Sequence, residues 1–535
     1  MDLDLVISGA TVVDGTGAPP ARVDVGVSAA TIVAVGDLTG ASAGRTLDAT
    51  GLVVSPGFID THAHVEAALL DQGAVAAKLA QGVTTEILGQ DGLSYAPLAA
   101  QRLREQADYL LPLNGRYRGQ GATFLEFLDQ YDRATAQNVS SLAPYGAIRI
   151  AVAGWTDRAL DSEQLQHAAD LAEACLNQGA VGVGLGLDYF PQSIATTAEL
   201  LELGRVVAAH GSVLVAHTRS RALGIVEAVR EMVEVGAATG ARVHISHLRA
   251  AAALPVIDEA LDRGVDVTFD VYPYAVASSM MLMHVPPWSL VGGPAALMDR
   301  LHDSRSRARI ARHLSDRLDA VADEYVLSGF AKDTYASLAG ASLAQAAGSL
   351  GGTVGDVLTA MLADNDLAVG YVGSTVSDDS VAACMRHPAG MVCSDAILVG
   401  QRPHPRGWGS FPRYLIACTR SPGGLSLEQA VHAMTGRPAR RFDLAGRGVI
   451  RSGKAADLVV LDLNALADYA TYDAPRQLAG GVEAVVVNGE IVWADAADTG
   501  NRPGRALRRH DLAGPRSSSP VRSPSNVTIV DNRYE

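Results

Sequence analysis

The sequence predicts an α/β protein: a (β/α)8 barrel of the TIM type with a small β-sandwich built from both ends of the chain. Composition gives the first indication, because the 535 residues are 48% hydrophobic but only 5% aromatic and include 54 glycines, which suits close packing of small side chains. Short strand-like runs also occur near both ends. Between them, apolar strand candidates alternate with helical stretches, as they do in parallel β/α units.

The β-sandwich is predicted to comprise residues 1–55 and 441–500. Its strand candidates are residues 5–8, 23–27 and 31–35 near the start, and 457–462 and 482–489 near the end. These runs are rich in valine, isoleucine and leucine, and glycines separate several of them. Two sets of short strands flanking a long α/β region indicate that the two ends of the chain pair into one domain.

The barrel is predicted to occupy residues 56–440. Its eight strand candidates are residues 52–60, 83–89, 146–153, 180–187, 212–217, 242–247, 265–271 and 390–395. Helical stretches such as 197–209 and 225–238 lie between them. The step from the seventh strand to the eighth exceeds a hundred residues, so we expect an inserted lid at about 280–350 over the barrel mouth. Catalytic residues of such barrels lie at the C-terminal ends of the strands.

Composition also excludes several classes of partner. The formal net charge of −15 argues against nucleic acid, because phosphate contacts need a basic face. The four cysteines are few and widely spaced, which is typical of reduced thiols. We therefore expect a cytoplasmic protein, because disulfides are rare in that compartment. No signal peptide and no run of about 18 apolar residues is evident, so we expect no membrane span. We expect a monomer or small homo-oligomer, and a flexible polar tail over residues 501–535.

A pair of histidines closes the first strand candidate. His62 and His64 follow the apolar run of residues 52–57, and residues two apart in a strand point to the same face. Two imidazoles placed this way can bind one divalent metal ion. An isolated pair of this kind also occurs as half-exposed histidines in a turn.

Further ligand types stand at later strand ends. His217 ends the fifth strand candidate, His247 the sixth, and Asp395 the eighth. Each one alone is typical of a capping or structural residue, but together with His62 and His64 they predict a metal centre. His244 is the weaker choice on its strand, because its odd spacing from His247 turns it to the opposite face.

The chain resembles the amidohydrolase superfamily and, within it, the D-aminoacylase (N-acyl-D-amino-acid deacylase) family over most of residues 1–500. The resemblance rests on the segments 57–64 (GFIDTHAH), 82–85 (GVTT), 246–249 (SHLR), 272–274 (YPY), 394–395 (SD), 402–406 (RPHPR), 408–413 (WGSFPR) and 434–439 (MTGRPA).

The resemblance implies a metal site. His62 and His64 would hold one metal position, His217 and His247 the second, and Asp395 would act as general base on a metal-bound water. Family members carry a cysteine ligand after strand two, where this chain has Asp91. We therefore expect zinc, as one or two ions, with manganese or cobalt also possible because carboxylate is a harder ligand than thiolate. The alternative for Asp91 is a helix cap.

The same resemblance implies the substrate contacts. Arg249 stands where relatives carry a lysine for the free carboxylate of the substrate, while Tyr189, Tyr274 and Ser279 match segments that position it. The expected activity is metal-dependent hydrolysis of an N-acyl-D-amino acid or related N-acyl compound, a small-molecule substrate.

Two alternatives remain: a cyclic amidase of the dihydroorotase or hydantoinase kind, and a non-catalytic scaffold. The three lysines lie away from barrel strand ends, which argues against a bridging lysine and the cyclic amidase.

Overall fold

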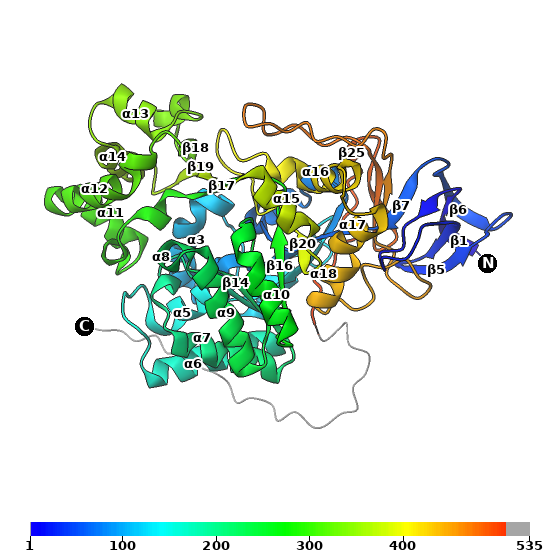
Figure 1. Ribbon diagram of the computed structural model, residues 1–535, viewed down its shortest axis with the longest axis horizontal. Helices are drawn as coiled ribbons and strands as arrows, with labels where there is room; N and C mark the ends of the chain where they lie inside the picture. Colours follow the sequence, from blue (N-terminus) through cyan, green and yellow to red (C-terminus); the bar gives the residue numbers. More distant parts are fainter. Residues whose placement is uncertain (1, 510–535) are drawn as a thin grey trace.

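The computed structural model describes residues 2–509, and a barrel of eight parallel strands lies at its centre (Figure 1). In chain order the strands are β8 (Phe58–Asp60), β10 (Val83–Leu88), β11 (Asn138–Ser141) with its continuation β12 (Ala143–Pro144), β13 (Gly182–Gly186), β14 (Val213–His217), β15 (Arg242–Ile245), β16 (Val267–Val271) and β20 (Gly390–Val392). Each pairs in parallel with its neighbours in this order. The predicted α/β barrel is confirmed.

The first and last strands meet beyond their ends. Within the described residues β8 and β20 share no ladder, but β9 (Ala63–His64) and β21 (Ala396–Ile397), which directly follow them, pair in parallel. The backbone N–H of Asp395 also donates to the carbonyl of His62 at 2.7 Å. The ring of strands is therefore joined at the level of the candidate ligands.

The prediction of a strand at residues 146–153 was wrong. These residues belong to α5 (Tyr145–Ala153), and the third barrel strand is formed by β11 and β12 just before it. The error has a physical reason: the apolar run in α5 is buried on several sides, and a short apolar run does not distinguish a buried helix from a buried strand. The true strand carries polar side chains, so its sequence lacks the apolar signal.

Helices surround the barrel and cover the outward faces of its strands. The principal ones are α3 (Ala100–Asn114), α6 (Ser162–Asn177), α7 (Thr197–Ala209), α9 (Ile225–Thr239), α10 (Leu254–Asp262), α15 (Asp378–Arg386), α16 (Arg406–Arg420), α17 (Leu427–Met434) and α18 (Gly436–Arg441). In α7 the Thr196 hydroxyl accepts from the backbone of Glu199 in a capping box, and Leu200 and Leu203 are buried on its inner face.

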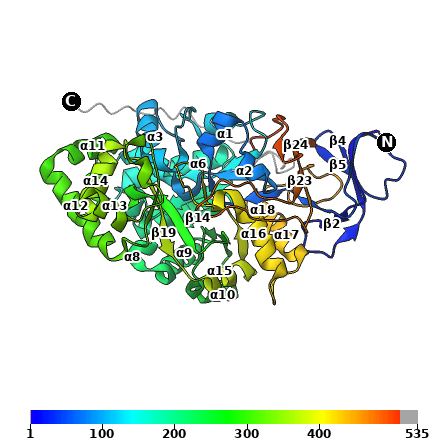
Figure 2. The ribbon, with the colours of Figure 1, turned by 90° about the horizontal axis from the view of Figure 1, so that it is seen from above.

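An insert separates β16 from β20 and is longer than the predicted lid, because it spans residues 276–375. Its strands β17 (Val276–Met280), β18 (Val326–Phe330) and β19 (Val369–Thr375) form an antiparallel sheet in the order β17-β19-β18. Four helices accompany this sheet: α11 (Pro294–His302), α12 (Ser304–Leu318), α13 (Leu343–Leu350) and α14 (Val354–Asp364). Figure 2 shows the insert at the opposite end of the molecule from the N-terminal strands.

No single helix in residues 2–509 is long and apolar enough to cross a membrane. The pair formed by α13 and α14 reaches that length and composition together, but it is bent by 85°.

The β-sandwich consists of two sheets that draw on both ends of the chain. One sheet has the order β5-β4-β1-β6, and the other has the order β25-β24-β23-β22-β7-β2-β3. Their strands are β1 (Asp2–Ser8), β2 (Thr11–Val12), β3 (Ala21–Arg22), β4 (Asp24–Ser28), β5 (Thr31–Gly36), β6 (Ser42–Asp48), β7 (Val53–Pro56), β22 (Leu458–Leu461), β23 (Val482–Val487), β24 (Glu490–Ala494) and β25 (Ala497–Asp498). A shared apolar core joins them, and β7 runs directly into barrel strand β8.

A flexible tail was predicted to begin at residue 501. Residues 501–509 instead lie against the barrel. Ala506 forms a parallel bridge with Val139, whose carbonyl accepts from the N–H of Leu507 at 2.7 Å. Leu507 is buried in an apolar cluster with Leu142. The two apolar residues and the free edge groups of β11 explain this docking. The rest of the predicted tail, 510–535, lies outside the described residues.

Candidate metal centre

The first two histidines follow β8 and face Asp395 across the barrel mouth. Oδ1 of Asp395 lies 3.7 Å from Nε2 of His62 and 3.6 Å from Nε2 of His64. All three side chains are buried. Behind them, Oδ1 of the buried Asp60 accepts the N–H groups of His62 at 3.2 Å and of Ser394 at 2.9 Å. One carboxylate thus fixes the first and last strands relative to each other.

Asp60 is held in turn by Lys78, a fully buried lysine in α2 (Ala76–Leu79). Its Nζ pairs with Asp60, donates to Ser394 Oγ at 2.6 Å and lies 3.6 Å from Glu86 Oε2. Burial opposes the charge of Lys78, but the two carboxylates outweigh it and raise the lysine pKa. Burial raises the pKa of Glu86 to about 8. The Lys78 ammonium is therefore bound by Asp60, Ser394 and Glu86 behind the histidines and does not face the candidate ligands.

Asp91 lies at the centre of the four histidines. Its Oδ1 is 3.4 Å from Nε2 of His62 and 3.8 Å from Nε2 of His247. Its Oδ2 is 3.6 Å from both Nε2 of His64 and Nδ1 of His217. Burial raises the pKa of a carboxyl, yet His62 and His217 hold the Asp91 pKa well below its usual value. The carboxylate faces the histidines and makes no helix cap.

The second pair of histidines is oriented by carboxylates that sequence reasoning missed. Nδ1 of His217 and Nε2 of His247 lie 3.0 Å apart, and Nε2 of His217 lies 3.3 Å from Asp188. The backbone N–H of His247 donates to Asp270, a fully buried residue of β16. Asp188 thus fixes the ring orientation of His217, as carboxylates behind metal-binding histidines do, while Asp270 fixes the backbone of His247. Residues 265–271 contain a second acid, Asp266, so nothing in the sequence distinguished Asp270.

His244 is turned away from this cluster, as its spacing predicts. Its Nε2 lies 3.0 Å from Asp270 and its Nδ1 lies 2.7 Å from Thr268 Oγ1. Its ring packs against Phe442. His244 therefore holds Asp270 from behind and does not face the candidate ligands.

Asp395 is held by Arg406, which belongs to the segment 402–406 and whose role was not predicted from the sequence. Nη1 of this fully buried arginine lies 2.9 Å from Oδ2 of Asp395, and its guanidinium stacks 4.6 Å above the ring of Tyr272. Burial opposes the arginine charge, but Asp395 outweighs it and raises the Arg406 pKa. Because Arg406 holds Oδ2, Oδ1 is left to face His62 and His64.

Three residues of the cluster have a left-handed backbone: Asp91 with φ 57°, His247 with φ 37° and Asp395 with φ 47°. Such conformations are costly for residues other than glycine and concentrate at functional sites. Their occurrence at three candidate ligands indicates that the surrounding structure imposes these positions.

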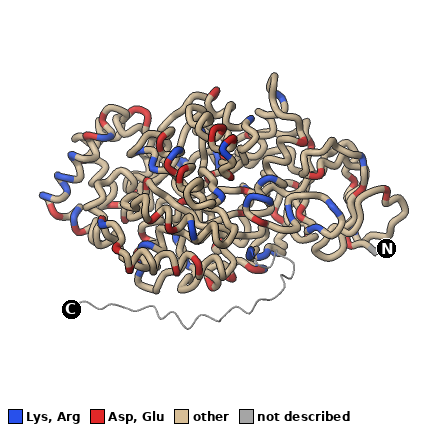
Figure 3. The backbone as a smooth tube through the Cα atoms, turned by 60° about the horizontal axis from the view of Figure 1, so that its bottom comes forward, with Lys and Arg blue, Asp and Glu red and all other residues tan. Residues whose placement is uncertain are grey.

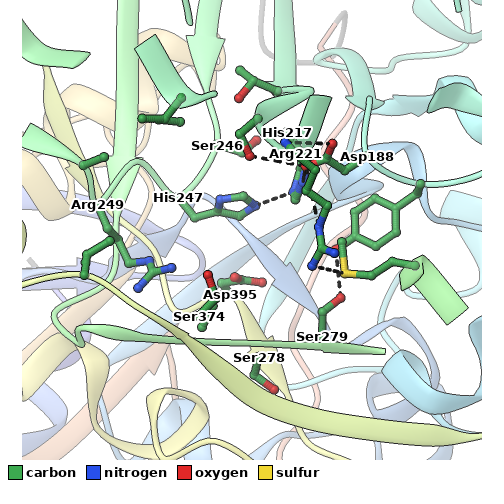
Figure 4. Close-up of a pocket in the computed structure, with 18 of the residues that line it drawn as sticks. Asp188, His217, Arg221, Ser246, His247, Arg249, Ser278, Ser279, Ser374 and Asp395 are labelled. Carbon is green, nitrogen blue, oxygen red and sulfur yellow. Dashed lines mark hydrogen bonds and ion pairs between the residues drawn. The ribbon is translucent and has the colours of Figure 1, made fainter. Parts of the chain in front are cut away.

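A cavity of about 440 Å³ opens over the cluster (Figure 4). Three of the residues expected to contact the substrate, Arg249, Tyr189 and Ser279, line it, and the hydroxyls of Tyr189 and Ser279 lie 3.0 Å apart. Tyr274 does not line it, in contrast to expectation, because its hydroxyl donates to Asp468 at 2.8 Å. Tyr272, two residues earlier, lines the cavity instead.

The donor set fits divalent metal ions. Both ring nitrogens of His62, Nδ1 of His64 and Oδ1 of Asp91 are buried without a hydrogen-bond partner in the described part of the chain. Two groups, His62–His64–Asp395 and His62–Asp91–His247, bring one ligand atom each within 4.8 Å of one another. Burial lowers a histidine pKa, yet Asp91 outweighs it and raises that of His62 to about 9 and that of His217 to about 10. This negative potential favours a bound cation.

Comparison with known proteins agrees with this geometry. A model of the amidohydrolase family matches residues 45–493. D-aminoacylase of Alcaligenes xylosoxydans xylosoxydans is 34% identical, with 95% of this chain and 98% of the relative covered. N-acyl-D-glutamate deacylase of the same organism is 35% identical, with 95% and 97% covered.

Solved structures extend the similarity to three dimensions. N-acyl-D-glutamate deacylase of Bordetella bronchiseptica, solved with zinc and a phosphonate inhibitor, matches with a TM-score of 0.81 at 32% identity, over 95% of this chain and all of that one. D-aminoacylase matches with a TM-score of 0.78 at 32% identity and the same coverage. D-hydantoinase, at 16% identity and a TM-score of 0.55, shares the fold. The chain belongs to the amidohydrolase family, with a barrel and an additional β-domain that resemble those of D-aminoacylase.

Proposed function

We propose that this protein is a metal-dependent deacylase that hydrolyses the amide bond of N-acyl-D-amino acids. One observation carries the proposal: four histidines converge on Asp91, with Asp395 beside them, at a cavity that also contains Arg249. The names of the similar proteins, D-aminoacylase and N-acyl-D-glutamate deacylase, support the same class of substrate.

His62 and His64 would hold one metal position, and His217 and His247 the other, with the carboxylate of Asp91 facing all four histidines. A divalent ion there supplies a Lewis acid that polarises the scissile carbonyl and acidifies a water molecule. Zinc is the first candidate, since a similar structure contains it. The carboxylate of Asp91 also suits manganese or cobalt, which accept oxygen ligands more readily than thiolates.

The proton steps are assigned to Asp395. Its Oδ1 faces the cluster while Arg406 holds Oδ2, so Oδ1 can accept a proton from the attacking water and pass it to the departing amine. Arg249 has no ion-pair partner within residues 2–509, and its guanidinium lies 5.0 Å from the ring centre of Tyr272. Its forked donors suit the free carboxylate of the substrate.

The cyclic amidase alternative gains no support from the site. Lys78, the lysine nearest the histidines in sequence, is engaged with Asp60 and Ser394. Lys332 pairs with Asp366 at the surface of the insert.

Metal analysis combined with a substrate panel tests the proposal. Purified protein should contain a divalent metal and should release amino acid from N-acetyl-D-amino acids faster than from the L-enantiomers or from hydantoins. Metal without activity on N-acyl-amino acids would overturn the deacylase assignment.

Asp395→Asn tests the proton-transfer role within the same experiment. General acid–base groups contribute about 100- to 10,000-fold, so we expect kcat to fall by that factor. Bound metal, measured by mass spectrometry, should remain near the wild-type level. Asp258→Asn is the matched control, because Asp258 is exposed and pairs with His387 outside the cavity. Substantial residual turnover in Asp395→Asn would contradict the role.

A further inference from the structure

The cavity has a second basic region, away from Arg249, where the barrel meets the insert. Arg221, in α8 (Ser220–Leu223) after strand β14, lies there beside Met283, His284 and Tyr371 of the insert. Figure 4 shows Arg249 and Arg221 on different sides of His247 and Asp395. The reacting centre therefore lies between two arginines.

The charge of Arg221 is poorly balanced. Its guanidinium donates to the Tyr371 hydroxyl at 2.9 Å, to the His284 ring at 3.1 Å and to Met283 Sδ at 3.2 Å, all of them neutral acceptors. The nearest carboxylate, Asp188, is 4.0 Å from its Nε. Asp188 also accepts from His217, so its charge is shared. A partly buried cation is stabilised by a close anionic partner, and the three groups that accept from Arg221 carry no charge.

Two nearby basic groups increase the positive potential. Arg317, an exposed residue of α12, lines the cavity and has no ion-pair partner in the part of the chain that the structure describes. It belongs to a helix with five arginines, visible at the insert end of the molecule in Figure 3. Burial, Arg221, Arg317 and His313 together hold the His284 pKa well below its usual value.

The cavity lining has more basic than acidic side chains. It includes three arginines and two aspartates, and both aspartates already have partners, because Asp395 pairs with Arg406 and Asp188 bonds His217. The Arg221 side chain keeps 24% exposure. This exposed part lines the cavity, so a ligand anion in the cavity can approach it.

We propose that the substrate carries a second anionic group, a carboxylate in addition to the one bound by Arg249, and that Arg221 binds it. The inference rests on the proposed deacylase function and specifies its substrate class as dianionic N-acyl-amino acids. Since the scissile amide lies between the two arginines, the second carboxylate belongs either to the amino-acid side chain or to the acyl group.

Two matched pairs of substrates separate these sources. N-acetyl-D-glutamate and N-acetyl-D-glutamine differ only by charge in the side chain, while N-succinyl-D-alanine and N-butanoyl-D-alanine differ mainly by charge in the acyl group. We expect the wild-type kcat/KM to favour the charged member of one pair by at least about tenfold, the size of a charge-assisted hydrogen bond. No preference in either pair would overturn the proposal.

Variants of Arg221 test the residue itself. Arg221→Gln should reduce that preference by about tenfold or more, and Arg221→Lys should restore part of it. If Arg221 only ties α8 to the insert, Arg221→Gln will lower both members of a pair equally, which would overturn the proposal. Arg263→Gln, a change at an exposed arginine paired with Glu234, is the matched control and should leave the ratio unchanged.

A binding measurement keeps this test independent of turnover. If no member of either pair is hydrolysed, the deacylase proposal fails, but calorimetric binding of the same compounds to the metal-loaded protein still tests Arg221. Tighter binding of the charged member, lost in Arg221→Gln, supports the anion site. Equal binding of both members overturns it.

Discussion

The histidine side and the insert side of the cavity differ in how their charges are held. On the histidine side the candidate ligands are buried, and further charged groups fix them from behind, namely Asp60, Asp188, Asp270 and Arg406. On the insert side Arg317 has no ion-pair partner within residues 2–509, and Arg221 is bonded mainly to neutral groups.

This difference separates two tasks within one cavity. Charges fixed on all sides keep a metal centre in one geometry, which serves the reaction common to every substrate. Arginines without a close anionic partner can instead bind an anionic group of the substrate, and by our proposal they would distinguish one substrate from another. Changes on the histidine side should therefore affect all substrates alike, and changes on the arginine side should affect them selectively.

The largest effect should follow from Asp91→Asn. Losing the carboxylate that faces four histidines should release metal and lower kcat/KM by more than about 100-fold for every substrate, because changes behind the ligands alone cost 10- to 100-fold. Metal content and turnover are measured together. Asp91→Cys is the conservative control and should retain zinc better than manganese. Wild-type metal content in Asp91→Asn would contradict a role of Asp91 in holding the metal.

A smaller and selective effect should follow from Arg249→Gln. A hydrogen bond to a charged group contributes about 1.5–3 kcal/mol, so KM should rise about 10- to 100-fold for substrates with a free α-carboxylate. The amides of the same substrates should show little change. Steady-state kinetics on both series measure the difference, and an equal loss on both would mean that Arg249 supports the site structurally.

The smallest effect on turnover should follow from Glu86→Gln, which we expect to change stability alone. The folded-state pKa of Glu86 is about 8 against an ordinary value of 4.5, so the folded protein keeps a proton that the unfolded chain releases. Wild-type stability should consequently decline as pH rises from about 4.5 to 8, at up to about 1.4 kcal/mol per pH unit. Glu86→Gln cannot release this proton, so its stability should not decline in this way. The difference in melting temperature between variant and wild type should therefore grow as pH rises from about 4.5 to 8. A constant difference across pH would contradict the assigned pKa.

Much of the cluster could be located from sequence because parallel strands end at one edge of a barrel. The structure brings His62, His64, His217, His247 and Asp395 together there, each at or just beyond the end of a strand. The β-sandwich was foreseeable for a similar reason, since short strands at both ends need partners.

The partners behind the ligands could not be predicted, because they depend on tertiary contact and not on local pattern. Asp270 follows an ordinary strand pattern, and Arg406 approaches Asp395 only through the packing of α16. The position of Arg221 in the cavity likewise depends on the insert, whose sequence does not indicate which barrel residues it covers. The wrong third strand shows the same limit, as burial on several sides made α5 resemble a strand.

The pairing of β7 with β22 has a consequence for the order in which the chain folds. Val54 of β7 pairs with Val460 of β22. On the ribosome β7 can therefore pair with β22 only after about four hundred further residues have been synthesised. At 5–20 residues per second this takes roughly 20 to 80 s. Throughout that time one edge of β7 is open on the nascent chain, and we expect chaperones to protect it until the ribosome delivers the partner strand.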